Sequence, residues 1–367
     1  MICEIGSEFW YDPAAFREFP DVNETLLAQS LGLDGKPVFT SSGRSACALL
    51  LQSIRPVKKT VYLPEYTCES VTAPFQKAGY DVYCYRVTDD LNIDLEQWWN
   101  QFDAIKPGVV LLHPYFGFDT IEKLRPQFDR IRSNDAILIE DVTHSLFSRF
   151  SREHQPDYTI ASLRKWLGIS DGGFVCHGLG RDALCPPADD DHQFVNLRQE
   201  AFVLKNEYIT DGDLTKKTRF LSLFNQAEAV LDQSQIPCKM STFSRKILKN
   251  TDWDFMRLQR CQNYRFLERE FRNFPSLFRP IFTVLPDNVC PLYMPIWLYG
   301  NRQSLREHLI EHRIYPPVHW PLPSLLKSGK MRTHDVYQHG LSIPCDQRYT
   351  PEHLGRIIEV LHGYKGK

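Results

Sequence analysis

The sequence contains no cluster of lysine or arginine residues and carries little net charge. Its 43 basic and 45 acidic residues give a formal net charge of −2, so nucleic acids and anionic membranes are poor candidate partners. Its ten cysteines include no C-x-x-C pair, which argues against a structural zinc site. Unpatterned cysteines in a chain of 367 residues are typical of a reducing compartment, so we expect a cytoplasmic protein without a metal centre.

Signals for export, membranes and dinucleotide binding are also missing. The first residues show neither the basic start nor the apolar stretch of a signal peptide, and no apolar run reaches the length of a transmembrane helix. No G-x-G-x-x-G motif follows an early strand, which disfavours a dinucleotide-binding enzyme. The sequence has no internal repeat and no low-complexity tract.

What the chain does contain is a regular alternation of short apolar runs and amphipathic stretches between residues 36 and 180. This alternation predicts the α/β class, with a mostly parallel mixed sheet between helices. The length indicates two domains, a large one over 1–250 and, over 251–367, a bridging helix with a small C-terminal α+β domain. The predicted strands are 61–64, 80–87, 108–117, 136–142, 158–162, 172–177 and 290–298, and the predicted helices are 67–79, 93–102, 120–132, 198–209, 216–233, 252–274, 302–313 and 351–364.

Two of the apolar runs end in charged residues. The run over 137–140 ends in Asp141, and the run over 158–161 is followed by Ser162 and Lys165. Ligands of open α/β sheets bind at the carboxyl ends of the strands. An acid and a lysine at neighbouring strand ends are what pyridoxal phosphate (PLP) requires, because the lysine forms a Schiff base and the acid keeps the ring nitrogen protonated.

Lys165 is therefore the candidate Schiff-base residue, and Asp141 is the candidate partner of the ring nitrogen. A Schiff-base lysine must be partly desolvated, and we expect the apolar neighbours Leu163, Trp166 and Leu167 to do this. The alternatives are a surface lysine and an aspartate that caps the next segment. Glu140 would point to the opposite face of its strand from Asp141.

A histidine and a serine-rich turn add to this set. His144 lies just beyond the strand end and is a candidate contact of the cofactor ring or its phenolic oxygen, with a structural role as the alternative. The segment Ser-Ser-Gly-Arg-Ser joins a strand to an apolar helix. Free backbone N–H groups and hydroxyls at a helix start bind anions, so Ser42, Gly43 and Arg44 predict a phosphate cup. The alternative is an ordinary N-cap by Ser42.

The remaining candidates are more isolated. Tyr66 and Cys68 follow the strand over 61–64, where a flat side chain would stack on the cofactor ring, and core packing is the alternative for Tyr66. His319 and Arg348 are polar groups of the predicted second domain that could reach a substrate, and a structural role is the favoured alternative for both. Arg245 is a further candidate for a substrate, phosphate or subunit contact.

With these residues in view, the chain resembles the DegT/DnrJ/EryC1/StrS family of PLP-dependent aminotransferases, which have the aspartate-aminotransferase fold. The resemblance covers most of the chain and depends on the order and spacing of SGRSA, LPEYTCESV, IEDVTHS, SLRK followed by GG, RCQNYRFLE and IPCDQRYTPEHLGRIIEVL. It implies a PLP-transferase-like large domain and a homodimer with active sites at the subunit interface. It also implies Lys165 as the Schiff-base lysine, Asp141 as the pyridinium partner and Ser162 as a phosphate ligand, with His144 where the family often has Gln.

The resemblance further implies amino transfer to keto sugars attached to nucleotides, with glutamate as the usual donor. The chain departs from the family pattern at Arg44, where the family has Thr, and at Cys68, where it has an aromatic residue. We therefore expect a PLP-dependent aminotransferase that moves an amino group from an amino acid to a keto acceptor such as a nucleotide-linked keto sugar. The alternatives are another PLP reaction, such as elimination or decarboxylation, and a non-catalytic ligand-binding protein with the same fold.

Overall fold

The structure is a computed structural model, and it describes residues 4–11, 24–33, 35–151, 153–178, 184–189, 192–234, 236–327 and 335–366. The chain forms two compact units. The first unit contains Glu8–Arg55 and Asp157–Thr251, and the second contains Glu4–Ser7, Pro56–Pro156 and Asp252–Lys367. Within the ranges that the structure describes, no helix combines the length and the apolar character needed to cross a membrane.

The main sheet has seven strands. They are β2 (Pro37–Thr40), β3 (Thr60–Pro64), β4 (Asp81–Tyr85), β5 (Val109–Leu112), β6 (Ile137–Asp141), β7 (Tyr158–Ser162) and β8 (Gly173–His177). Their order in the sheet is β2-β8-β7-β6-β5-β3-β4. The sheet is mixed and mostly parallel, and it alternates along the chain with helices, which confirms the predicted α/β class.

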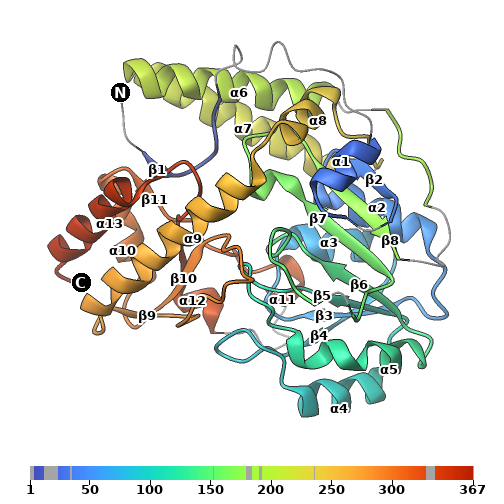
Figure 1. The fold of residues 1–367 in the computed structure, drawn as a ribbon. Helices are drawn as coiled ribbons and strands as arrows, with labels where there is room; N and C mark the ends of the chain where they lie inside the picture. The colour runs from blue at the N-terminus through green and yellow to red at the C-terminus, as the bar shows by residue number, and fades with distance from the viewer. Residues whose placement is uncertain are drawn as a thin grey trace. The chain divides into compact units, whose positions relative to one another are not determined.

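In the first unit, β8 lies between β2 and β7 and is antiparallel to both. A Cβ on Gly173 at the start of β8 would lie 2.4 Å from the carbonyl carbon of Ser42, so only glycine allows this close approach. Helices α6 and α7 pack along each other as a hairpin (Figure 1). The helical elements of this unit are α1 (Glu24–Ser30), α2 (Gly43–Ser53), the 3-10 turn η3 (Leu163–Lys165), α6 (His192–Asp211), α7 (Leu214–Gln233) and α8 (Thr242–Lys249).

In the second unit, the pairs β3–β4, β3–β5 and β5–β6 are all parallel. β3 and β5 are buried along their whole length, as expected for parallel strands that are covered on both faces. β5 ends at Leu112, earlier than predicted, because Pro114 has no N–H to donate to the sheet. The helical elements that follow these strands are α3 (Glu69–Lys77), α4 (Leu95–Ile105), η2 (Glu122–Gln127) and α5 (Phe128–Arg132).

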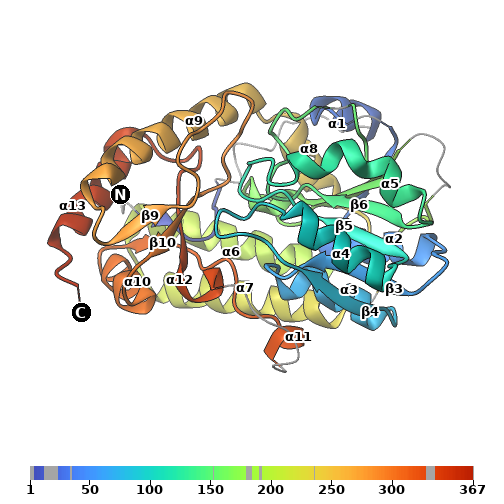
Figure 2. The same cartoon turned by 90° about the horizontal axis from the view of Figure 1, so that it is seen from below.

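The C-terminal part of the second unit contains a smaller antiparallel sheet. Its strands are β9 (Phe278–Pro280), β10 (Met294–Leu298) and β12 (Gly340–Ile343), in the order β12-β10-β9. Figure 2 shows α9, α10 and α13 gathered around this sheet. The other elements of this part are α9 (Trp253–Glu270), η4 (Phe271–Asn273), α10 (Arg302–Glu311), α11 (Ser324–Lys327), α12 (Val336–His339), α13 (Pro351–Gly363) and the parallel pair β1 (Ile5–Gly6) and β11 (Ile314–Tyr315).

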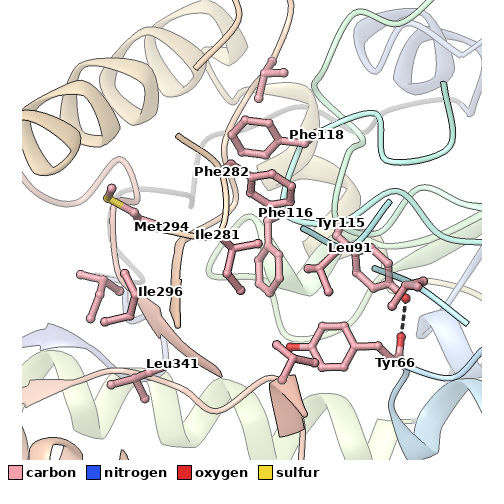
Figure 3. Close-up of a cluster of buried hydrophobic side chains, with 14 of the residues drawn as sticks. Tyr66, Leu91, Tyr115, Phe116, Phe118, Ile281, Phe282, Met294, Ile296 and Leu341 are labelled. Carbon is pink, nitrogen blue, oxygen red and sulfur yellow. Dashed lines mark hydrogen bonds between the residues drawn. The ribbon is translucent and has the colours of Figure 1, made fainter. Parts of the chain in front are cut away.

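A cluster of buried aromatic and aliphatic side chains joins the two parts of the second unit (Figure 3). The rings of Phe118 and Phe282 stack with their centroids 3.9 Å apart. The hydroxyl of Tyr115 donates a hydrogen bond to the carbonyl oxygen of Tyr66. The segment after β3 is therefore anchored in this core. The predicted domain boundary at residue 250 stays a prediction, although Thr251 and Asp252 do fall in different units.

Candidate active site

The candidate lysine lies in the tight turn that directly follows β7 in the first unit. Leu163 and Trp166 are buried in the core, whereas Lys165 is exposed. Successive side chains of a single 3-10 turn point in different directions, so burying the two apolar residues turns the lysine outward. The expectation that these neighbours desolvate Lys165 is therefore wrong.

The serine-rich turn lies in the same unit, at the start of α2. Ser42 is the N-cap of this helix, because its hydroxyl accepts the N–H of Ser45 at 3.1 Å. The hydroxyls of Ser41 and Ser45 lie 2.9 Å apart, and all three serines are buried. A Cβ on Gly43 would lie 3.0 Å from the Cβ of Ser162, so Ser162 lies directly against the turn. The N-cap interpretation is correct, and the helix start still presents backbone N–H groups and hydroxyls that suit an anion.

Arg44, the third residue predicted for the phosphate cup, is engaged elsewhere. Its guanidinium forms an ion pair with Asp232 and lies 3.8 Å from Glu228, both on α7. Two carboxylates offset the charge of one arginine, so Arg44 contributes less positive potential to the turn than the sequence suggested.

The candidate acid lies in the second unit, at the end of β6. In the parallel pair β5–β6, Leu112 is opposite Glu140, so His113 and Asp141 are the next residues along the two strands. The Oδ2 atom of Asp141 lies 3.6 Å from Nδ1 of His113. Its Oδ1 atom accepts the N–H of Thr143 at 2.9 Å.

These neighbours keep the buried carboxylate of Asp141 charged. Burial raises its pKa, but His113 and Thr143 lower the pKa by more, and the result lies below the usual value for aspartate. The adjacent Glu140 points to the other face of the strand, where Arg125 donates to both of its oxygens at 2.8 and 3.0 Å. Asp141 is thus the carboxylate that is suited to a cationic ligand.

His113 is a functional candidate that the sequence interpretation missed. Its side chain is buried, and neither ring nitrogen has a hydrogen-bond partner among the described residues. An unpartnered buried imidazole beside a carboxylate is typical of a functional site. A signal for it exists, because His113 directly follows an apolar strand in the same way as Asp141 does.

His144 and Trp320 complete this group of rings. The His144 ring is buried, and its centroid lies 4.7 Å from that of His113. The N–H of Phe116 donates to Nδ1 of His144 at 3.4 Å, which leaves the proton of the neutral ring on Nε2. Trp320 stacks on His144 with centroids 5.2 Å apart and an interplanar angle of 28°. No local sequence signal marks Trp320, because only tertiary packing brings it to this place.

Tyr66 and Cys68 were predicted to lie against the cofactor ring, but both have other partners in the structure. Tyr66 is buried, and its ring packs against those of Tyr115, Trp320 and Tyr337 with centroids 4.9 to 5.3 Å apart. The alternative of core packing therefore describes Tyr66 (Figure 3). Cys68 is the N-cap residue of α3, and its thiol lies 2.6 Å from the hydroxyl of Ser70.

The three predicted substrate residues all have local partners. In the second unit, Nδ1 of His319 lies 2.8 Å from the hydroxyl of Ser342. Arg348 donates to both carboxylate oxygens of Asp346 at 2.8 Å. In the first unit, the guanidinium of Arg245 donates to Glu24 at 3.5 Å and to the hydroxyl of Thr242 at 3.3 Å. Each of the three side chains therefore has at least one partner within its own unit.

Neither a protein-family model nor a characterised protein matches the sequence. Solved structures do match it over nearly the whole length. PseC of Helicobacter pylori, an aminotransferase involved in the biosynthesis of pseudoaminic acid, is 14% identical with a TM-score of 0.67, over 98% of this chain and 99% of PseC. The chain has the fold of an aminotransferase.

Two further structures have the same fold. A DegT DnrJ EryC1 StrS aminotransferase from Brucella abortus is 18% identical with a TM-score of 0.65, over 98% of this chain and 92% of that chain. Spr1654 of Streptococcus pneumoniae, solved in a PLP form, is 13% identical with a TM-score of 0.63, over 97% of each chain. The fold that the family resemblance implied is therefore confirmed, and the likeness at these identities is one of fold.

Proposed function

We propose that the protein is a PLP-dependent aminotransferase. It would move an amino group from an amino acid, with glutamate as the first candidate donor, to a keto acceptor such as a nucleotide-linked keto sugar. The observation that carries this proposal is the buried, ionised carboxylate of Asp141 at the end of a parallel strand. The fold supports the class of reaction, and Spr1654, which shares the fold, has been solved in PLP and PMP forms.

The residues present fit PLP. A phosphate suits the turn at Ser42 and Gly43, where buried hydroxyls and the backbone N–H groups of a helix start meet. A cationic ring nitrogen suits the charged carboxylate of Asp141. Lys165 offers an exposed amine on a short turn. When bound, PLP supplies an electron sink for the electron pair left on the substrate carbon.

Each of these residues has a separate task in amino transfer. Asp141 would keep the proton on the ring nitrogen, which keeps the ring electron-withdrawing. The Nζ atom of Lys165 would bind the aldehyde carbon of the cofactor and, once displaced by the donor, carry a proton from the donor Cα to the C4′ carbon. The hydroxyls of Ser42 and Ser162 would bind the phosphate, and Nε2 of His144 would donate to the phenolic oxygen.

We further propose that the protein is a cytoplasmic homodimer. An amine must be partly desolvated to be neutral and reactive, and Lys165 is exposed in the single chain. A second copy of the chain that covers this turn would supply the desolvation. The nine cysteines of the described residues are all free thiols, which supports a reducing compartment. A monomer in light scattering that retains full activity would contradict the dimer.

The proposed function is tested by the visible spectrum of the purified protein. After incubation with PLP, we expect a yellow protein whose absorbance band shifts when glutamate is added. Borohydride reduction followed by peptide mass mapping should locate the cofactor on Lys165. The Lys165→Ala variant is the control and should stay unlabelled. A wild-type protein that remains colourless in excess PLP would contradict the proposal and favour a non-catalytic binding protein.

A further inference from the structure

One carboxylate in the first unit contacts three arginines from three different elements. Glu228, on α7, accepts a hydrogen bond from Arg198 of α6 at 3.2 Å and another from Arg164 of η3. The guanidinium of Arg44, near the start of α2, lies 3.8 Å from the second oxygen of Glu228. Glu228 therefore links the hairpin of α6 and α7 to two other segments. One is η3, which carries Lys165 and is called the lysine turn below. The other is the segment around Ser42 and Gly43, which is called the serine turn.

The charges around Glu228 make this link strong. Burial raises the pKa of Glu228, but Arg164 and Arg198 lower it by more, to about 2. The side chain of Arg198 is only 3% exposed, and burial together with Arg164 lowers its pKa, whereas Glu8 and Glu228 raise it. The two arginines repel each other, and Glu228 is the carboxylate to which both donate a hydrogen bond. Without it, Arg164 would lose its ion pair with Glu228, and the repulsion from Arg198, which keeps its ion pair with Glu8, would remain.

Arg164 connects Glu228 to the turn that carries the candidate lysine. It directly precedes Lys165 in a helix of a single turn, so its side chain fixes the orientation of that turn. Its guanidinium lies 5.1 Å from the ring centroid of Phe194 on α6, which is a second fixed contact. At the other end of the link, Arg44 follows Gly43, which packs against Ser162 just before the lysine turn.

We propose that Glu228 is a positioning residue that aligns the lysine turn with the serine turn. In this role it acts through Arg164, and it sets the geometry in which Lys165 meets the aldehyde of a ligand whose phosphate lies at Ser42 and Gly43. The inference rests on the proposed function, because it assumes that Lys165 and the serine turn bind the same PLP. Glu228 itself contacts neither the cofactor nor the substrate.

The test compares two phosphorylated ligands that differ in the aldehyde. PLP can form a bond to Lys165, whereas pyridoxine 5′-phosphate can occupy the phosphate cup but cannot form that bond. We expect Glu228→Gln to weaken PLP binding about tenfold, within the range of couplings between residues of one network. It should change the affinity for pyridoxine 5′-phosphate by less than about twofold, which is within the usual scatter of surface effects.

Two further variants make the test specific. Glu200→Gln, on the same hairpin, breaks the exposed ion pair with Arg219 and should leave both affinities unchanged. Arg164→Met removes the guanidinium that donates to Glu228 and should reproduce the selective loss of PLP binding. This variant tests the inference even if Glu228→Gln fails to fold. The double variant should be no weaker than either single variant, because both remove the same interaction.

Each outcome decides between positioning and a general structural role. Equal losses for both ligands would show that Glu228 supports the fold or the phosphate cup, and would overturn the inference. Unchanged PLP affinity in Glu228→Gln would overturn it as well. If the wild-type protein binds pyridoxine 5′-phosphate but forms no bond with PLP at Lys165, the proposed function fails instead, and this result is visible before any variant is measured.

Discussion

Two buried aspartates, one in each compact unit, have opposite electrostatic environments. Asp141 ends β6 in the second unit, and Asp171 precedes β8 in the first. Their exposed fractions are similar, 5% and 0%. Yet the pKa of Asp141 lies below its ordinary value and the pKa of Asp171 lies above it. The difference cannot come from burial, which raises both pKa values, so it must come from the groups around each carboxylate.

The groups that donate hydrogen bonds to Asp171 are neutral, and the more distant charge of Arg164, which lowers its pKa, does not offset the effect of burial. It accepts hydrogen bonds from the backbone N–H and the hydroxyl of Ser241 at 2.7 and 2.6 Å, and from the hydroxyl of Ser244 at 2.5 Å. These groups are at the start of α8, and Asp171 therefore anchors that helix start to the segment before β8. Its oxygens have their partners within the fold, which is typical of a structural role.

Asp141 has a partner that can carry charge and an oxygen that remains available. Among the described residues, Thr143 alone donates a backbone hydrogen bond to it, and His113 lies 3.6 Å from its other oxygen, beyond direct hydrogen-bond distance. Such a carboxylate stays ionised and can accept a further donor. The comparison therefore distinguishes an acid that completes the fold from one that is suited to a ligand.

The largest expected effect comes from removing the charge of Asp141. Asn has almost the same shape but cannot stabilise a cationic ring nitrogen, and breaking a buried ion pair costs about 3–5 kcal/mol. We therefore expect Asp141→Asn to lower turnover by at least about 10²-fold, measured with glutamate and a keto acceptor. Asp171→Asn is the matched control and should keep turnover close to wild type. Equal losses in both variants would remove the functional distinction between the two aspartates.

Much of the fold could be predicted because buried elements have a characteristic pattern of apolar residues in the sequence. Strands that are buried on both faces are continuous apolar runs, and the predicted strand over 158–162 matches β7 at both ends. Strand ends were harder to predict where tertiary contacts decide them. The strand predicted over 290–298 begins only at Met294, because Arg260 binds the carbonyl oxygens of Pro291 and Leu292.

The residues of the candidate site also fall into two groups: those that a local sequence pattern marks and those that only tertiary contacts place. Asp141 could be found because it ends an apolar strand, and His113 carries the same signal on the neighbouring strand. Trp320 and Glu228 could not be found, since only the packing of distant segments brings them to their partners. The exposure of Lys165 was predicted wrongly because apolar neighbours in sequence point elsewhere in a tight turn.

Removing His113 should weaken the distinction between the aspartates without abolishing it. In His113→Phe, the effect of His113 on Asp141 is lost while burial remains, so the pKa of Asp141 should rise. We expect turnover near neutral pH to fall about tenfold and the acidic limb of the pH–activity profile to move to higher pH. His339→Phe is the control, because His339 lies outside this group and its ring stacks on Trp297, with centroids 5.3 Å apart. An unmoved acidic limb would show that His113 does not act on Asp141.

The two aspartates should also affect stability with opposite dependence on pH. The folded pKa of Asp141 is below the unfolded value of about 3.9, so its stabilisation is present above that pH and is lost as the pH falls through the folded pKa. The folded pKa of Asp171 is above the unfolded value, so the wild type loses stability as the pH rises from about 4 through the folded pKa.

The measurement is the free energy of urea unfolding between about pH 3 and pH 7. The difference in free energy of unfolding between the wild type and Asp141→Asn should increase as the pH rises. The difference between the wild type and Asp171→Asn should shrink over the same range. Parallel trends for the two variants would mean that the two carboxylates do not differ as described.

The smallest expected effect comes from one of the donors to Asp171. Ser244→Ala removes the hydroxyl that donates to this carboxylate and accepts the N–H of Asp171 at 3.4 Å, and it leaves both bonds from Ser241 in place. We expect unfolding to be easier by about 1–2 kcal/mol, in line with the loss of one short hydrogen bond to an ionisable group and one long bond from a backbone N–H, with turnover unchanged. Ser222→Ala, which removes only an exposed contact with Gln226, should cost less than about 0.5 kcal/mol. A loss of turnover in Ser244→Ala would mean that the anchoring of α8 affects the catalytic reaction. Asp171 would then have more than a structural role, and the contrast with Asp141 would fail.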